Sequence, residues 1–88
     1  MIAIRKLAAS FTEASIDDEV ILMRLDNGEL LSLAETAAAV WRLIDGSRDR
    51  NALITALGAE FAGDEQLIAR EVGELLQQLK EAGLVAEG

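Results

Sequence analysis

The feature that most constrains this chain is a pair of apolar runs on either side of an Asn-Gly dipeptide. The first run is Val20–Leu25 (VILMRL), the dipeptide is Asn27–Gly28, and the second run is Glu29–Leu33 (ELLSL). Asn-Gly favours the positive φ angles of a two-residue type I′ turn. The segment therefore predicts a β-hairpin.

This hairpin is expected to be apolar on both faces. With Asn27 and Gly28 as the loop, Leu25 pairs with Leu30 and Leu22 pairs with Leu33. One face then carries Val20, Leu22, Leu31 and Leu33, and the other carries Ile21, Met23, Leu25 and Leu30. A domain of 88 residues can cover only one face of such a sheet with its own helices. The second face needs the N-terminal segment, a second copy of the chain or a ligand.

The N-terminal segment offers further strand candidates. Ser10–Ser15 (SFTEAS) alternates weakly, and Ile2–Leu7 (IAIRKL) is a second candidate strand or a pairing arm. We expect a three-stranded antiparallel sheet within about residues 2–33. Cover of the second sheet face by residues 1–12 is the plain structural explanation of its apolar character.

Helical spacing begins after the hairpin and continues almost to the end of the chain. The pattern predicts helices at about residues 35–45, 48–62 and 64–82, with Ser47 or Asp49 capping the second helix and Asp64 capping the third. Glycines at positions 46 and 83 follow the first and third helices. The expected buried positions are Ala37, Val40, Trp41 and Ile44, then Leu53, Ile54, Leu57 and Phe61, then Ile68, Val72, Leu75, Leu76 and Leu79.

A small sheet followed by three helices indicates the α+β class and a winged helix-turn-helix fold. Length and composition agree with a single domain over residues 1–88, since 51% of the residues are hydrophobic and 27% are charged. We expect Trp41, the single tryptophan, to fill the core. No apolar run reaches the roughly 18–20 residues of a membrane span, so a cytoplasmic protein without a membrane partner is expected.

Composition argues against an enzyme. The chain has no histidine and no cysteine, which removes the commonest general base, the thiolate nucleophile and two frequent metal ligands. The acidic run Asp17–Glu19 has no cation-binding spacing and reads as a solvated loop. We therefore expect no catalytic residue, no metal site and no cofactor.

The charge of the chain also disfavours nucleic acid, which many winged helix-turn-helix proteins bind. The net charge is −8, and the third helix with its cap, Asp64–Glu81, carries five acidic side chains against two basic ones. Such a helix repels a phosphate backbone. No nucleic-acid partner is expected, and a DNA-binding regulator is the weakest alternative.

Peptide recognition remains as the leading interpretation. An outer hairpin strand presents unpaired N–H and C=O groups, to which an extended peptide can add as a further strand. The candidate edge is the strand Glu29–Leu33. A homodimeric interaction module, in which a second copy covers the apolar face and the edge, is the main alternative.

The segment from Gly28 to Leu57 (GELLSLAETAAAVWRLIDGSRDRNALITAL), followed by an acidic capped helix that ends in LLQQLKEAGLV, resembles the PqqD-like family, also called RiPP recognition elements. The similarity covers roughly residues 20–85. It implies a non-catalytic adaptor that binds the leader segment of a ribosomally made precursor peptide and delivers it to a modifying enzyme or protease. The family serves pyrroloquinoline quinone, lasso peptide and other pathways. Because the chain ends where the module ends, we expect a discrete adaptor.

The resemblance also implies where the leader binds, in the groove between the outer hairpin strand and the third helix. Carried over by position, the peptide-binding residues are Glu29, Leu30, Leu31, Ser32 and Leu33 on the strand, and Ile68, Val72, Leu75, Leu76 and Leu79 on the helix. One position departs from the family pattern, because Ala34 stands where an N-capping Asn is common. We expect the first helix to be capped by another group or to fray by a turn.

Overall fold

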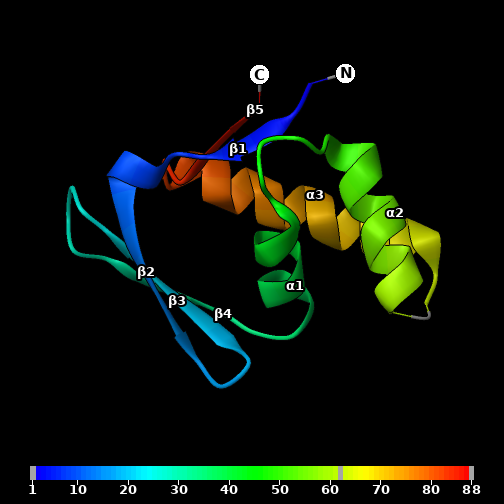
Figure 1. Ribbon diagram of the computed structural model, residues 1–88, viewed down its shortest axis with the longest axis horizontal. Helices are drawn as coiled ribbons and strands as arrows, with labels where there is room; N and C mark the ends of the chain where they lie inside the picture. The colour runs from blue at the N-terminus through cyan, green and yellow to red at the C-terminus, as the bar shows by residue number, and fades with distance from the viewer. Residues whose placement is uncertain (1, 62, 88) are drawn as a thin grey trace.

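The computed structural model describes residues 2–61 and 63–87 and has the expected winged helix-turn-helix fold, a three-stranded antiparallel sheet followed by three helices (Figure 1). The elements in chain order are β1 (Ile4–Lys6), the 3-10 turn η1 (Ala8–Ser10), β2 (Phe11–Ile16), β3 (Glu19–Arg24), β4 (Leu30–Leu33), α1 (Thr36–Leu43), α2 (Arg50–Glu60), α3 (Glu65–Glu81) and β5 (Val85–Glu87).

The strands form two separate sheets. The larger has the order β2-β3-β4, and the smaller is a ribbon in which β1 pairs antiparallel with the C-terminal β5. Figure 1 shows the ribbon and both chain ends on one side of the molecule, away from the larger sheet. The expected cover of the second sheet face by residues 1–12 is not what the fold shows, because Met23 and Leu30 on that face stay exposed. Nor do residues 1–12 pair with β4, since β1 belongs to the ribbon and β2 lies on the other side of β3.

The predicted hairpin is present, but its register is two residues away from the predicted one. Met23 pairs with Leu30 and Leu22 pairs with Leu31, so the expected pairing of Leu25 with Leu30 is wrong. The cause is a four-residue loop, residues 25–28, which is closed by a hydrogen bond from the Gly28 N–H to the carbonyl of Arg24 (2.9 Å). A shift of two residues preserves the side-chain alternation. Val20, Leu22 and Leu33 are buried as expected, and Leu31 is half-buried.

The second and third helices begin at the predicted acidic caps. The Asp49 carboxylate accepts a hydrogen bond from the Ala52 N–H (2.8 Å), and the Asp64 carboxylate accepts one from the Gln66 N–H (2.8 Å). Each bond satisfies an N–H that has no partner within its own helix. The second helix is shorter than the predicted range 48–62, and residue 62 lies outside the described residues.

The core lies between the inner face of the sheet and the three helices. It contains most of the positions expected from helical spacing, including all five apolar positions expected in α3. Phe61 is an exception, because α2 ends at Glu60 and leaves that side chain 38% exposed. The buried residues are Ile4, Val20, Leu22, Leu33, Ala38, Ala39, Val40, Trp41, Ile44, Leu53, Leu57, Ile68, Val72, Leu75, Leu76, Leu79, Leu84 and Val85.

Trp41 fills the centre of this core, as predicted. Its ring packs edge-to-face against Phe11 of β2, with the two centroids 5.2 Å apart, and the Lys6 ammonium lies 4.4 Å from the centroid of the indole ring. Burial lowers the pKa of Lys6 from its ordinary value, while Glu13 and Asp45 act in the opposite direction. Trp41 thereby joins β1 and β2 to α1.

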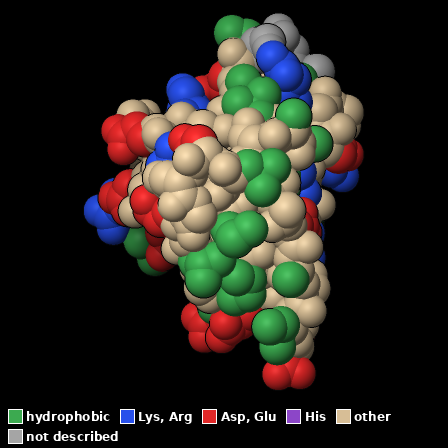
Figure 2. Space-filling model, turned by 90° about the vertical axis from the view of Figure 1, so that its left-hand side faces the viewer, with side chains coloured by type: hydrophobic (Ala, Val, Ile, Leu, Met, Phe, Trp, Pro, Cys, Tyr) green, Lys and Arg blue, Asp and Glu red, His purple; other side chains and the backbone are tan. Residues whose placement is uncertain are grey.

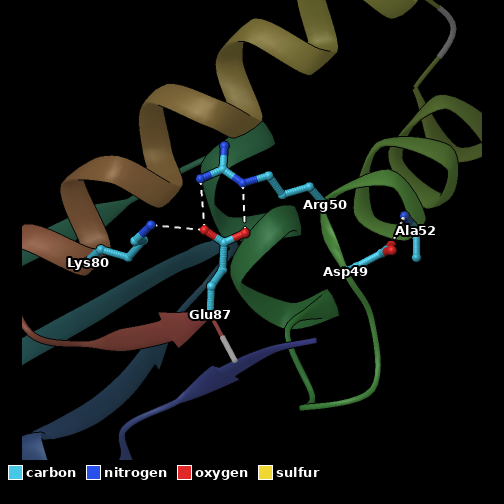
Figure 3. A network of polar contacts seen from close by, with 5 residues as sticks. All are labelled: Asp49, Arg50, Ala52, Lys80 and Glu87. Atoms are coloured by element: carbon cyan, nitrogen blue, oxygen red, sulfur yellow. Dashed lines mark hydrogen bonds and ion pairs between the residues drawn. The ribbon is translucent and has the colours of Figure 1, made fainter. Parts of the chain in front are cut away.

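A second set of contacts fixes the ribbon to the helices (Figure 3). Glu87 of β5 accepts two hydrogen bonds from the Arg50 guanidinium (2.8 and 2.9 Å) and one from the Lys80 ammonium (2.9 Å). These bonds lower the pKa of Glu87 to about 2, with the Arg50 contribution the largest. The C-terminal strand is thus tied to α2 and α3 as well as to β1.

The helices contain no candidate membrane span. Across residues 2–61 and 63–87, each helix is too short or too polar to cross a bilayer.

Candidate functional site

The outer edge of β4 has main-chain groups that no other strand uses. The Arg24 N–H donates to the Glu29 carbonyl (2.9 Å), which sets the alternation of the β3–β4 pairing. Main-chain groups of Leu31 and Leu33 consequently face β3, while those of Leu30 and Ser32 face away from it. Within residues 2–61 and 63–87, no protein group bonds the outward-facing groups. The edge is free to accept an extended chain.

A groove runs beside this edge on the inner side of the sheet. It consists of two cavities of about 350 and 400 Å³ that share Gln78 as a lining residue. The first lies between α1 and α3 and is lined by Ala34, Glu35, Thr36, Ala37, Val40, Glu71, Glu74, Leu75 and Gln78. The second lies between the hairpin and the C-terminal end of α3 and is lined by Arg24, Glu29, Leu31, Gln78, Glu81 and Ala82.

These linings show how α3 runs relative to β4. On the side of α3 that lines the groove, Glu71 lies near Ala34, just after β4. Glu81, at the C-terminal end of the helix, lies near Glu29, just before β4. Helix and strand are therefore antiparallel along the groove. From Glu71 to Glu81 the helix rises about 15 Å, which is the length of four to five residues of extended chain.

The structure separates the strand residues expected at the site into three positions. Leu31 lines the groove, and Glu29 lines its end beside Arg24. Leu33 is buried in the core. Leu30 and Ser32 are exposed on the opposite face of the sheet, so their outward main-chain groups, rather than their side chains, reach the edge.

The helix residues expected at the site lie mostly in the core. Ile68, Val72, Leu76 and Leu79 are buried under the sheet and helices, and Leu75 alone among the five lines the groove. The groove wall is instead the adjacent stripe of α3, which consists of Glu71, Glu74, Leu75, Gln78, Glu81 and Ala82. These positions follow an i, i+3, i+7 spacing beside the apolar stripe, and this helical periodicity was the available sequence signal.

The start of α1 forms one end of the groove and is strained. Glu35 has φ +54° and ψ −122°, and its side chain makes no capping hydrogen bond. Such a conformation costs of the order of 1–3 kcal/mol for a residue with a side chain. Position 34 is Ala and not a capping Asn, and α1 begins at Thr36. The Ala34 carbonyl accepts a hydrogen bond from the Ala37 N–H (3.1 Å).

The hairpin end of the groove holds one cation that is already paired. The Arg24 guanidinium donates to both carboxylate oxygens of Asp26 (2.8 and 3.2 Å) and lies 4.0 Å from a carboxylate oxygen of Glu29. The hydrogen bonds from Arg24 lower the pKa of Asp26 from its ordinary value. Arg24 therefore adds little unbalanced positive charge to the groove.

The outer face of the sheet forms a second apolar surface. Figure 2 shows hydrophobic side chains gathered on one side of the molecule, with acidic side chains at the lower end of the same view. Strand register places Ala14 and Ile16 of β2, Ile21 and Met23 of β3 and Leu30 of β4 on the outer face. Ile16 is 61% exposed and Leu30 is 65% exposed. No helix of the described chain covers this face.

Neither surface carries a cluster suited to a metal ion. Among the described residues, no group of three or more acidic side chains is arranged to hold one.

The fold and the groove define a class of protein, the small winged helix-turn-helix module with a free strand edge beside its third helix. The chain matches the family model described as coenzyme PQQ synthesis protein D (PqqD) over residues 19–85, and it belongs to that family.

Two curated relatives are each named PqqA binding protein and come from Rhodopseudomonas palustris strains TIE-1 and ATCC BAA-98 / CGA009. Each is 36% identical over 58 residues, an alignment that covers 66% of this chain and 57% of the relative. The matched region thus spans little more than half the length of these relatives.

Two solved structures have the same fold. TbiB1 in complex with the TbiA(beta) leader peptide is 26% identical, with a TM-score of 0.78 over 86% of this chain and 88% of that one. Lasso peptide synthetase B1 complexed with the leader peptide is 22% identical, with a TM-score of 0.81 over 94% of this chain and 96% of that one. At that lower identity the second structure supports the fold alone.

Proposed function

We propose that this protein binds the leader segment of a ribosomally synthesised precursor peptide as an added strand on β4. The observation that carries the proposal is the free main-chain edge at Leu30 and Ser32, which lies beside a groove about as long as four to five extended residues. The similarity to TbiB1, whose structure was solved with a leader peptide, supports the same assignment.

The protein acts as a non-catalytic adaptor in this proposal. A chain without histidine or cysteine lacks the usual general base and thiolate nucleophile. Its contribution is to hold the precursor near a peptide-modifying enzyme or protease and so raise the local concentration of substrate there. The apolar outer face of the sheet is distinct from the groove and supports a second interaction, with the modifying enzyme or protease.

Proline substitutions at matched edge positions test strand addition. Ser32→Pro removes an outward N–H from β4, and Ser15→Pro removes an outward N–H from β2, which lies on the opposite edge of the sheet from the groove. The probes are fluorescent PqqA and the TbiA(beta) leader peptide, titrated by anisotropy. We expect Ser32→Pro to weaken the peptide that binds by about thirtyfold, because a main-chain hydrogen bond is lost and the ring obstructs the edge.

The Ser15→Pro variant is expected to bind as the unmodified protein does. Equal affinities of the Ser32→Pro variant and the unmodified protein would show that β4 is not the docking edge. Comparing the two probes also shows which of the two peptides the site prefers.

A homodimeric interaction module is the second candidate function. The exposed side chains of Ile16, Met23 and Leu30 on the outer face favour it, since a second copy would bury them. Light scattering over a range of concentrations separates the candidates. A tight dimer that binds neither peptide supports the interaction module, and a monomer that binds one peptide supports the adaptor.

A further inference from the structure

The groove beside β4 combines an apolar floor with an acidic wall. Ala37 and the edge of Leu75 provide apolar surface in its first cavity, and Leu31 does so in the second. Around the first cavity stand the carboxylates of Glu35, Glu71 and Glu74. An extended peptide on β4 would meet both kinds of surface.

The three carboxylates lie outside the ion pairs of the described chain. Within the described chain, Glu35, Glu71 and Glu74 take part in no ion pair, while Lys80 of the same helix α3 is directed to Glu87. A chain with net charge −8 adds to the negative potential there. The groove therefore favours a ligand that supplies positive charge.

The distance between Glu71 and Leu75 along α3 is close to the distance between same-face side chains of an added strand. Successive side chains on one face of a strand are about 6.6–7 Å apart. On α3, Glu71 is about 6 Å from Leu75 along the helix axis and about 10 Å from Gln78. A peptide residue over Leu75 consequently has its same-face neighbour within reach of Glu71 and Glu74, at the end of the groove beside Ala34.

We propose that the leader segment recognised here carries a lysine or arginine two residues from an apolar anchor. The anchor packs on Leu75, and the basic side chain pairs with Glu71 and Glu74. This inference rests on the proposed strand addition and assigns the charge of the peptide that the same site selects. Glu71 and Glu74 are then specificity-determining residues, with Glu35 contributing at the same end of the groove.

Selection from a random library of displayed 12-residue peptides tests the inference whichever precursor the protein serves. We expect the full chain to enrich peptides in which Lys or Arg stands two residues from Leu, Ile, Val or Phe. The double variant Glu71→Gln, Glu74→Gln should bind the enriched peptides about tenfold more weakly, as expected for two partly exposed ion pairs. The affinity of the unmodified chain should also fall more steeply with salt than that of the variant.

A matched double variant controls for net charge. Glu13→Gln together with Glu65→Gln removes two exposed carboxylates that line neither cavity of the groove and should leave affinity unchanged. If peptides are enriched without a basic preference, or if both double variants bind equally, the charge assignment is wrong and strand addition stands. If the library, PqqA and the TbiA(beta) leader all fail to bind, the proposed function itself is wrong.

Discussion

The two sheets of this protein differ in whether the outward main-chain groups of an edge strand are hydrogen-bonded. In the ribbon, both outward main-chain groups of Ile4 have partners, because its N–H donates to the Arg48 carbonyl (2.9 Å) and its carbonyl accepts from the Gly46 N–H (3.1 Å). In the larger sheet, the outward groups of Leu30 and Ser32 have no partner among the described residues. The free edge is therefore not forced by small size, since the same chain closes an equivalent edge elsewhere.

The acidic side chains beside the two edges also differ in whether they form ion pairs. Next to the ribbon, the Glu87 carboxylate is bonded to both Arg50 and Lys80 (Figure 3). Next to β4, the carboxylates of Glu71 and Glu74 make no ion pair within the described chain. Satisfied groups hold the fold together, whereas unsatisfied groups remain available to a ligand.

Proline at the closed edge should have the largest effect on stability. Gly46→Pro removes the N–H that bonds Ile4 and cannot adopt the φ of +85° found at Gly46, so we expect a loss of about 3 kcal/mol or more. Ser32→Pro at the free edge should cost less than about 1 kcal/mol. Urea unfolding followed by Trp41 fluorescence measures both.

A Gly46→Ala variant separates the two causes, because it retains the N–H and should lose only about 1 kcal/mol. Similar losses for Ser32→Pro and Gly46→Pro would mean that the β4 edge is already bonded, and the contrast between the two sheets would disappear.

Removing the ribbon carboxylate should have the next largest effect, and the effect should depend on pH. Glu87 has a folded pKa of about 2, below its ordinary value of 4.5, so it stabilises the fold above pH 4.5 and loses that contribution as the pH falls towards 2. We expect Glu87→Gln to cost about 2 kcal/mol at pH 7, a figure reduced for the partial exposure of Arg50 and Lys80.

Thermal unfolding of the Glu87→Gln variant and the unmodified protein at pH 7, 4 and 2.5 measures this difference, which should shrink on acidification. Glu60→Gln, at an exposed carboxylate outside the network, serves as the control and should change stability by less than about 0.5 kcal/mol. A difference that stays constant from pH 7 to pH 2.5 would contradict the assigned pKa.

Relief of strain beside the open edge should increase stability by a smaller amount. Glu35→Gly replaces a residue with a positive φ by the one residue that adopts it without strain, and we expect a gain of about 1 kcal/mol. Asp17, in the β2–β3 turn, also has φ +54°, but aspartate tolerates the left-handed region. Asp17→Gly should therefore gain less, and a higher melting temperature for Asp17→Gly than for Glu35→Gly would locate the strain away from the groove.

The smallest effect is expected on the outer face of β4. Leu30 is 65% exposed and its side chain lies opposite the groove, so Leu30→Thr should change stability by less than about 0.5 kcal/mol and leave peptide affinity unchanged. The measurements are urea unfolding and peptide titration of the same sample. A large loss of affinity would indicate that the peptide contacts the outer face as well as the edge.

Local sequence signals were sufficient for most of the elements but not for their exact pairing. Acidic caps at Asp49 and Asp64 and the glycine after α3 indicate where these helices begin and end, because these residues act within one turn of the chain. Gly46 does not cap α1, which ends earlier, with Ile44 as its C-cap. The hairpin register was missed by two residues. The sequence favours a two-residue loop at Asn27–Gly28, and the four-residue loop competes with it through bonds that only the folded hairpin shows.

The candidate site was predictable in outline. Alternation along β3 and β4 predicted which strand residues point inward, and the family resemblance indicated the strand and the helix involved. The groove-facing stripe of α3 was not predicted, because apolar residues such as Val72 and Leu76 were expected at the ligand and are used instead by the core. The polar neighbours Glu71 and Gln78 form the wall.

The sequence alone determined the order of strands and helices and which side chains leave water, because turn residues, caps and apolar periodicity act over a few neighbouring positions. Tertiary structure decided which of the two small sheets keeps a free edge. That choice depends on pairing between residues far apart in the chain: Val85 pairs with Lys6 in the ribbon, whereas no described segment pairs with the outward main-chain groups of Ser32. Main-chain groups are the same at every position, so only the packing of distant segments determines where they remain unbonded.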